Sequence, residues 1–366
     1  MNLKEKYIVA FILSVLISGI FQVASEAQVF SDTSAMRMIR KGIDYTYNLQ
    51  FREAEAEVSE LSRLYPDHPV NLLFKGIIIY WENFPLLPST PASESYEKIL
   101  RRCIAKCEEN KNREIQPEIL LTNLSARGML LLFYSDNDLS RKVIPLSTST
   151  YHYIRQSFNY TSFSPDFYFF TGLYNYYREA YPEFHPIYKP VVAIFPKGNK
   201  LQGIKELDIC AHKSVFLKAD SYSFLQWIFA NYELDIPRSI EYCRILSELY
   251  PLNPHFTVNY IKSLIMSKRY DDAEHLTNTF SDPIKYPFIK AEMRILNGLL
   301  QENKYRKYSV ARDDYKEGIE GLKAFGPYGY EFSSLGYMGL SRICESEGDQ
   351  QGMRKYRRKA EEMNNN

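Results

Sequence analysis

Residues 61–69 read Leu-Ser-Arg-Leu-Tyr-Pro-Asp-His-Pro, and residues 246–254 read Leu-Ser-Glu-Leu-Tyr-Pro-Leu-Asn-Pro. The two stretches agree at six of nine positions, without a gap. In each stretch a helical pattern ends at Leu-Tyr, because the proline that follows cannot continue the helix. The second proline, three residues later, favours the first turn of a new helix. Both stretches therefore predict a corner between two helices, and their similarity indicates an internal repeat.

Helical spacing continues through the rest of the chain. Apolar residues recur mostly every three or four positions, and few stretches alternate as a β-strand would. Short clusters of proline, glycine, asparagine and aspartate, as at residues 85–91 and 135–138, separate segments that are long enough for one or two helices. We therefore predict an all-α fold.

The composition limits the classes of function. The chain has 366 residues, 45% of them hydrophobic, which fits roughly two to three domains or one elongated array with a large core. Lys and Arg number 45 and Asp and Glu number 44, so the formal net charge is +1. Because no strong positive field is available, we expect no nucleic-acid partner.

The copy before residue 70 carries a recognisable arrangement of small and large residues. Gly42 and Tyr45 lie on one predicted helix, and Phe51, Ala54 and Val58 lie on the next. This arrangement resembles the tetratricopeptide repeat, a unit of about 34 residues with Gly-x2-Tyr on its first helix and Ala-x3-Phe, then Pro, on its second. The resemblance implies an α-solenoid of antiparallel helix pairs that serves as a binding scaffold. It supplies no catalytic residue to carry over.

Within a single tetratricopeptide-like domain at residues 28–366, the best repeats fall at about residues 37–70, 220–280 and 335–363. Trp227 is a departure, because it stands where the repeat has a small residue. The two Leu-Tyr-Pro copies are also not separated by a whole number of units of about 34 residues. We therefore expect an irregular, aromatic-rich insert at about residues 92–215.

Residues 158–195 are crowded with tyrosine and phenylalanine. One interpretation is that rings from several helices fill a thick core. The other is that some of them line a groove for a sugar, a peptide or an apolar ligand. Tyr174, Tyr176 and Tyr177 are the candidates for such a groove, because tyrosine keeps a polar tip suited to a wet surface.

The first residues follow the order of a secretory signal peptide. Lys4 and Lys6 precede an apolar run, and small residues at positions 25 and 27 fit a cleavage site after Ala27. We expect residues 1–27 to be removed and the protein to be periplasmic or secreted, with no later membrane span. The alternative is an uncleaved N-terminal membrane anchor.

Five cysteines leave at least one thiol without an intramolecular partner. Cys103 and Cys107 are one helical turn apart, so they are either two small core residues on one face or a local disulfide. A zinc site is disfavoured, since no second pair of cysteine or histidine lies nearby at ligand spacing.

The sequence contains no complete motif for catalysis. The six histidines are scattered, no His-Glu-x-x-His is present, and the glycines at 198 and 203 are not followed by the Lys-Ser/Thr of a phosphate loop. We expect no catalytic residue, no cofactor and no metal ion.

The expected function is a non-catalytic exported scaffold for protein–protein interaction. Met38, Lys41 and Tyr45, on the first helix of the best-defined repeat, are the predicted contacts for a protein or peptide partner, because first helices build the concave face of such arrays. The alternative function is binding of a small ligand or glycan by the aromatic-rich segment at residues 158–195. The oligomeric state is left open.

Overall fold

The computed structural model describes residues 29–109, 116–279 and 285–365. The predicted signal peptide at residues 1–27 lies outside these residues. Within them the chain contains helices, turns and no β-strand, so the all-α prediction is confirmed. The α-helices of the first half are α2 (Thr33–Tyr47), α3 (Phe51–Leu64), α4 (Val70–Glu82), α5 (Pro91–Glu108), α6 (Pro117–Asp136), α7 (Ser140–Ser157), α8 (Phe167–Phe184), α9 (Lys189–Val192) and α10 (Lys200–Lys213). Those of the second half are α11 (Lys218–Asn231), α12 (Ile236–Leu249), α13 (Pro254–Met266), α14 (Tyr270–Thr279), α15 (Pro287–Asn303), α16 (Tyr308–Leu322), α17 (Tyr330–Ser346) and α18 (Gln350–Asn365). The 3₁₀ helices in the described part of the chain are η1 (Val29–Ser31), η2 (Pro186–Tyr188) and η4 (Lys323–Gly329).

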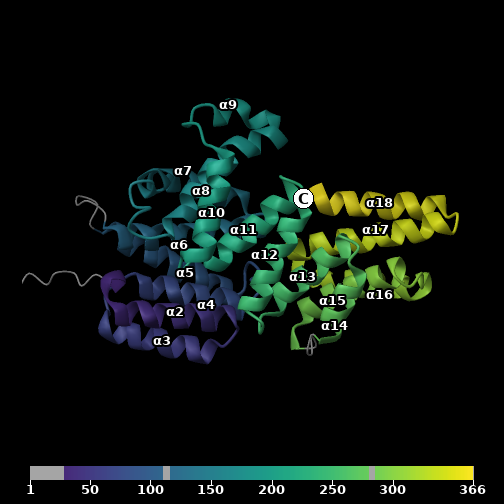
Figure 1. Ribbon diagram of the computed structural model, residues 1–366, viewed down its shortest axis with the longest axis horizontal. Helices are drawn as coiled ribbons and strands as arrows, with labels where there is room; N and C mark the ends of the chain where they lie inside the picture. Colours follow the sequence, from purple (N-terminus) through teal and green to yellow (C-terminus); the bar gives the residue numbers. More distant parts are fainter. Residues whose placement is uncertain (1–28, 110–115, 280–284, 366) are drawn as a thin grey trace, which may run out of the picture.

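The helices pack in succession as an α-solenoid (Figure 1). Neighbours in the chain form the pairs α2/α3, α4/α5, α6/α7, α8/α10, α11/α12, α13/α14, α15/α16 and α17/α18. The first helices of successive pairs also touch one another, as α2 does α4 and α4 does α6. The fold class that the sequence predicts is therefore present, with helix pairs of a kind compatible with a tetratricopeptide-like repeat.

The two Leu-Tyr-Pro stretches form the same corner. Tyr65, after α3, has φ −130° and ψ 64°, and Tyr250, after α12, has φ −129° and ψ 64°. Pro254 is then the first residue of α13, and Pro69 is the cap residue before α4. The predicted helix-to-helix corners are confirmed in both copies.

Gly42 allows two first helices to approach closely. It is buried on α2, and a Cβ atom in its place would overlap the ring of Phe74 on α4. Ala54 on α3 is likewise fully buried. The small residues of the best-defined repeat therefore lie at helix contacts, as the resemblance implies.

The second Leu-Tyr-Pro corner, between α12 and α13, contacts the C-terminal end of α2. Asn253 Nδ2 donates to the carbonyl oxygen of Tyr47 at 3.0 Å, and the rings of Tyr47 and Tyr250 lie 5.1 Å apart. These contacts bring the start of α13 against the end of α2, so α2–α13 wrap around a common interior. Beyond it, α14–α18 extend as an arm (Figure 1). A second hydrophobic core runs through this arm and also includes residues of α12 and α13, such as Ile240 and Ile261.

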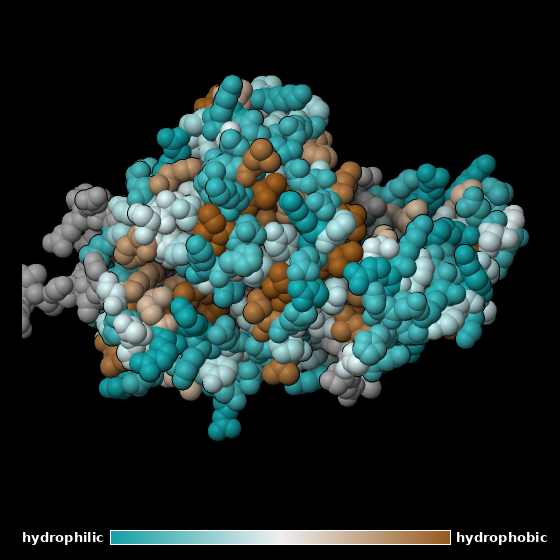
Figure 2. Space-filling view, viewed as in Figure 1, coloured by the Kyte–Doolittle hydropathy of each residue, from teal (hydrophilic) through white to brown (hydrophobic). Residues whose placement is uncertain are grey.

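The aromatic-rich segment at residues 158–195 contributes residues both to the hydrophobic core and to the surface. Phe167 and Tyr176 on α8 are fully buried, whereas Ile187 and Ile194, beside the short helix α9, are exposed. Figure 2 shows hydrophobic residues gathered in the middle of the molecule and a mainly hydrophilic C-terminal arm.

All five cysteines are buried and unbonded, so Cys103 and Cys107 are small core residues and do not form the local disulfide. No helix among residues 29–109, 116–279 and 285–365 combines the length and the apolar character needed to cross a bilayer.

Candidate functional site

The wrap of α2–α13 encloses a pocket of about 520 Å³ on its inner side. Its walls come mainly from the first helices of successive pairs, α2, α4, α6, α8, α11 and α13. The lining residues are Tyr47, Leu73, Ile77, Tyr80, Trp81, Phe84, Tyr96, Ser125, Met129, Leu132, Ser135, Asp136, Tyr177, Phe216, Leu217, Ala219, Asp220, Ser223, Phe224, Trp227, His255 and Phe256. The volume is in the range of sites that hold small ligands.

Aromatic rings make up much of this lining. Trp81 lies at the centre of one wall, with ring centroids 5.2 Å from Tyr47, 5.4 Å from Phe84 and 5.5 Å from Phe256. Trp227, on α11, also lines the pocket and is 45% exposed. Trp81 and Trp227 are the two tryptophans of the chain, so tryptophan emission reports on this pocket.

The mouth of the pocket lies where lining residues reach the surface. Leu132 and Ser135 on α6 are exposed, and so is Trp227 across from them on α11. The opening of the pocket therefore lies beside the C-terminal end of α6 and Trp227 of α11.

Two carboxylates lie in this apolar setting. Asp136 is the last residue of α6, and removal from water raises the pKa of its carboxyl from 3.8 to about 7. Asp220, in the first turn of α11, accepts a hydrogen bond from the Tyr47 hydroxyl at 2.7 Å. Burial also raises the pKa of Asp220, although the Tyr47 hydroxyl opposes that effect.

Two further polar side chains line the pocket. The Ser125 hydroxyl on α6 is 5% exposed and lacks a hydrogen-bond partner among the described residues. His255 on α13 has no partner at Nδ1 within the same part of the chain, while its Nε2 lies 3.2 Å from Asn259 Nδ2. Burial lowers the pKa of His255 to about 4, so its imidazole is neutral at pH 7.

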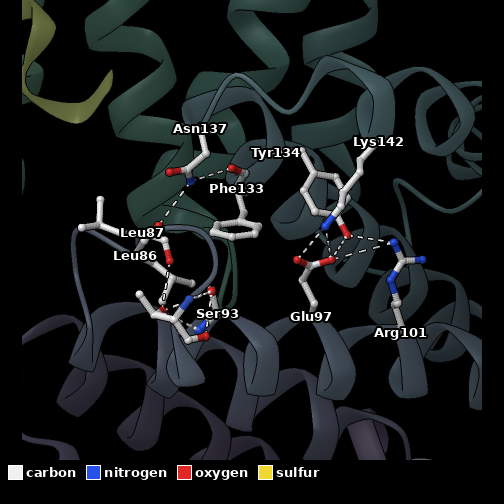
Figure 3. Close-up of polar contacts among 10 residues, drawn as sticks. Leu86, Leu87, Ser93, Glu97, Arg101, Phe133, Tyr134, Asn137 and Lys142 are labelled. Atoms are coloured by element: carbon white, nitrogen blue, oxygen red, sulfur yellow. Dashed lines mark hydrogen bonds and ion pairs between the residues drawn. The ribbon is translucent and has the colours of Figure 1, made fainter. Parts of the chain in front are cut away.

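Hydrogen bonds connect the C-terminal end of α6, which carries Asp136, to α5 and to the loop before α5 (Figure 3). Asn137 Nδ2 donates to the carbonyl oxygen of Leu86 at 3.2 Å, which ties α6 to the loop before α5. One turn earlier, the Tyr134 hydroxyl donates to Glu97 on α5 at 2.7 Å. These bonds fix the position of Asp136 relative to the aromatic wall.

The predicted contacts on α2 lie outside the pocket lining. Met38 and Tyr45 are half-buried and pack on the first hydrophobic core. Lys41 is exposed and lies 3.9 Å from Glu57, so it leans toward α3. The residue of α2 that reaches the pocket is Tyr47.

The three tyrosines of the middle segment have different surroundings. Tyr174 donates to the carbonyl oxygen of Pro196 at 2.7 Å, and the fully buried Tyr176 donates to Glu233 at 2.6 Å. Tyr177 lines the pocket. The segment at residues 158–195 therefore contributes one of its candidate tyrosines to this site.

The two aspartates and Trp81 are not among the residues that the sequence predicts for a binding site. One signal was visible, because Trp227 interrupts the repeat pattern at a position that needs a small residue. In the structure its ring lines the pocket and is 45% exposed, so the residue that departs from the expected pattern lies at this site. In the described residues no group of three or more histidine, cysteine, aspartate or glutamate side chains is arranged to hold a metal ion.

No model of a known protein family matches the chain. No curated protein matches its sequence either.

Proposed function

We propose that the chain is a tetratricopeptide-like binding protein that holds a protein partner on its concave side and performs no catalysis. The observation that supports this proposal is the aromatic pocket, because it is built from first helices and opens beside Trp227. The N-terminal pattern supports export, with residues 1–27 as the signal segment and a periplasmic or secreted location. In this proposal the pocket receives an anchoring side chain of the partner, as buried pockets at interfaces commonly do.

The test is affinity capture from an envelope fraction with three forms of the mature chain. Ser135→Phe places a large ring at the pocket mouth, and Ser147→Phe places the same ring on exposed helix α7 as a control. We expect a partner that is retained by the wild type and by Ser147→Phe and lost by Ser135→Phe. Equal capture by all three forms would remove the pocket from the proposal.

A small-ligand or glycan-binding protein is the second candidate. The observation that favours it is Tyr177, which brings the aromatic-rich middle segment into the pocket lining. Screening neutral sugars by thermal shift separates the two candidates, since only this second one predicts stabilisation by a sugar.

A further inference from the structure

The formal charges among the described residues that line the pocket are all negative. Its formally charged residues are Asp136 and Asp220, and among the described residues that line it there is neither lysine nor arginine. His255 adds no positive charge at neutral pH. A ligand that enters therefore meets carboxylates without any compensating cation from the protein.

The carboxylates and the serine have unused hydrogen-bonding capacity. Within the described part of the chain no hydrogen bond or ion pair reaches Asp136, and Asp220 accepts one bond from the side chain of Tyr47. An ionised carboxylate has about four acceptor positions. The buried hydroxyl of Ser125 is also unpartnered. The buried Ser125 hydroxyl is costly to leave unpaired, and the carboxylates have acceptor positions that no described residue fills, so the lining favours a ligand that donates hydrogen bonds.

The aromatic walls suit the same kind of ligand. The faces of tryptophan and tyrosine attract ammonium and guanidinium groups, and this attraction strengthens where water is excluded. The hydroxyls of Tyr80 and Tyr96 interact electrostatically with both Asp136 and Asp220, so both carboxylates lie near this part of the wall. The ring of Trp81 lies 5.6 Å from that of Tyr80. An anionic side chain would meet two carboxylates and gain none of these interactions.

We infer that the anchoring group of the protein partner is a basic side chain, lysine or arginine, held between Asp136, Asp220 and the aromatic walls of the pocket. This inference rests on the proposed function, because it names the chemistry of the group that the pocket receives. The stem of such a side chain lies along the apolar lining while its charged end meets the carboxylates.

The test uses three capped tripeptides that differ only in the central side chain: lysine, norleucine or glutamate. Binding is followed by tryptophan emission, because both tryptophans line the pocket, and by calorimetry. We expect the lysine peptide to bind about 10- to 100-fold more tightly than the norleucine peptide, the range for a charge-assisted hydrogen bond. The glutamate peptide should bind most weakly. Equal affinity for lysine and norleucine, preference for glutamate, or no binding of the lysine peptide overturns the inference.

Matched variants locate the effect. Asp136→Asn should reduce the preference for lysine to within a few-fold and leave the norleucine peptide unchanged. Asp313→Asn, which removes the same charge from the exposed face of α16, should retain the full preference. An unchanged preference in Asp136→Asn overturns the assignment of that carboxylate.

The affinity for the lysine peptide should also depend on pH. The titratable groups around Asp136 are Tyr80 on α4, Tyr96 on α5 and Tyr328 on η4, with Asp220 and His255 elsewhere in the lining. The tyrosines stay neutral, because burial raises the pKa of each. Affinity should therefore rise with pH toward about 7, where Asp136 ionises, and level off above it. A flat profile below pH 7 contradicts the inference.

A last pair of probes tests the source of the cation. Choline is compared with its uncharged isostere, in which a tert-butyl group replaces the trimethylammonium. If choline binds tightly and the lysine peptide does not bind, the cation that the pocket holds does not come from a peptide, and the inference is wrong. The partner capture with Ser135→Phe is independent of all these probes, so a failure of the inference and a failure of the proposed function give different results.

Discussion

Replacing Asp136 by asparagine should stabilise the protein at neutral and alkaline pH and leave it nearly unchanged in acid. Asparagine has almost the same shape as aspartate but carries no charge. In the wild type, the folded protein holds this carboxyl protonated up to about pH 7, whereas an exposed aspartate ionises near 3.8. Between those two pH values the folded state binds more protons than the unfolded state. Stability due to this group therefore falls as pH rises through that window.

The magnitude follows from the two pKa values. The difference between a pKa of about 7 and the ordinary 3.8 corresponds, at about 1.4 kcal/mol for each pH unit, to about 4 kcal/mol. Asp136 is half-buried beside the pocket mouth, so water screens part of this cost, and we expect about 2–4 kcal/mol. The stability of Asp136→Asn relative to wild type should rise by this amount from pH 4 to pH 7 and stay constant above about pH 8.

The assay is urea unfolding at a series of pH values, followed by tryptophan emission. Trp81 and Trp227 both line the pocket, so this signal reports the part of the array that contains Asp136. Asp313→Asn on the exposed face of α16 is the control, and its unfolding midpoints should run parallel to those of the wild type. If the curves of Asp136→Asn and wild type are also parallel, the carboxylate is not held in a costly environment, and the reasoning is refuted.

Two further predictions concern the packing and the ion pairs. Gly42→Ala should destabilise the protein by about 1–3 kcal/mol, because the added methyl group would overpack against the neighbouring helix α4. Gly128→Ala on α6 should be neutral or stabilising, because the nearest atom to its added methyl group would lie 3.9 Å away. Thermal unfolding of the two variants and the wild type measures both effects. Glu302→Ala should cost about 1–3 kcal/mol, because the buried Glu302 accepts from Arg342 Nε and Nη2 at 2.6 and 2.8 Å and from the hydroxyl of Tyr315, which is itself buried and would lose this partner. Glu362→Ala, in an exposed pair on α18, should cost less than about 1 kcal/mol in the same measurement, and similar losses for both would contradict this ranking.

The fold was predictable because its determinants are local. Helical spacing of apolar residues and the Leu-Tyr-Pro corners depend on residues within one or two turns of each other, and both copies adopt the same backbone angles. Gly42, a small residue within a helical pattern, lies at a close contact between two helices. These features can be predicted without knowing which distant parts of the chain come into contact.

The pocket was not predictable in the same way, because no local pattern contains it. Its lining extends from Tyr47 to Phe256 and depends on the return of the second corner to the end of α2. Tyr176 and Tyr177 illustrate the difficulty, since adjacent residues on a helix point about 100° apart. One donates to Glu233 in the interior, and the other lines the pocket. The sequence identifies both as tyrosines of one segment and does not separate their environments.

The carboxyl group at position 136 lowers the stability of the free protein, which supports a binding role for the pocket. An apolar pocket would be more stable with a neutral residue at position 136, since removal from water alone accounts for the raised pKa of the carboxyl there. Positions where a fold carries a destabilising group are commonly positions that serve function. A partner cation that pairs with Asp136 would recover the cost of burying its charge, and it would do so only when bound. The same group would therefore weaken the free protein and strengthen the complex, which makes the pH dependence of stability and the selectivity for lysine two measurements of one interaction.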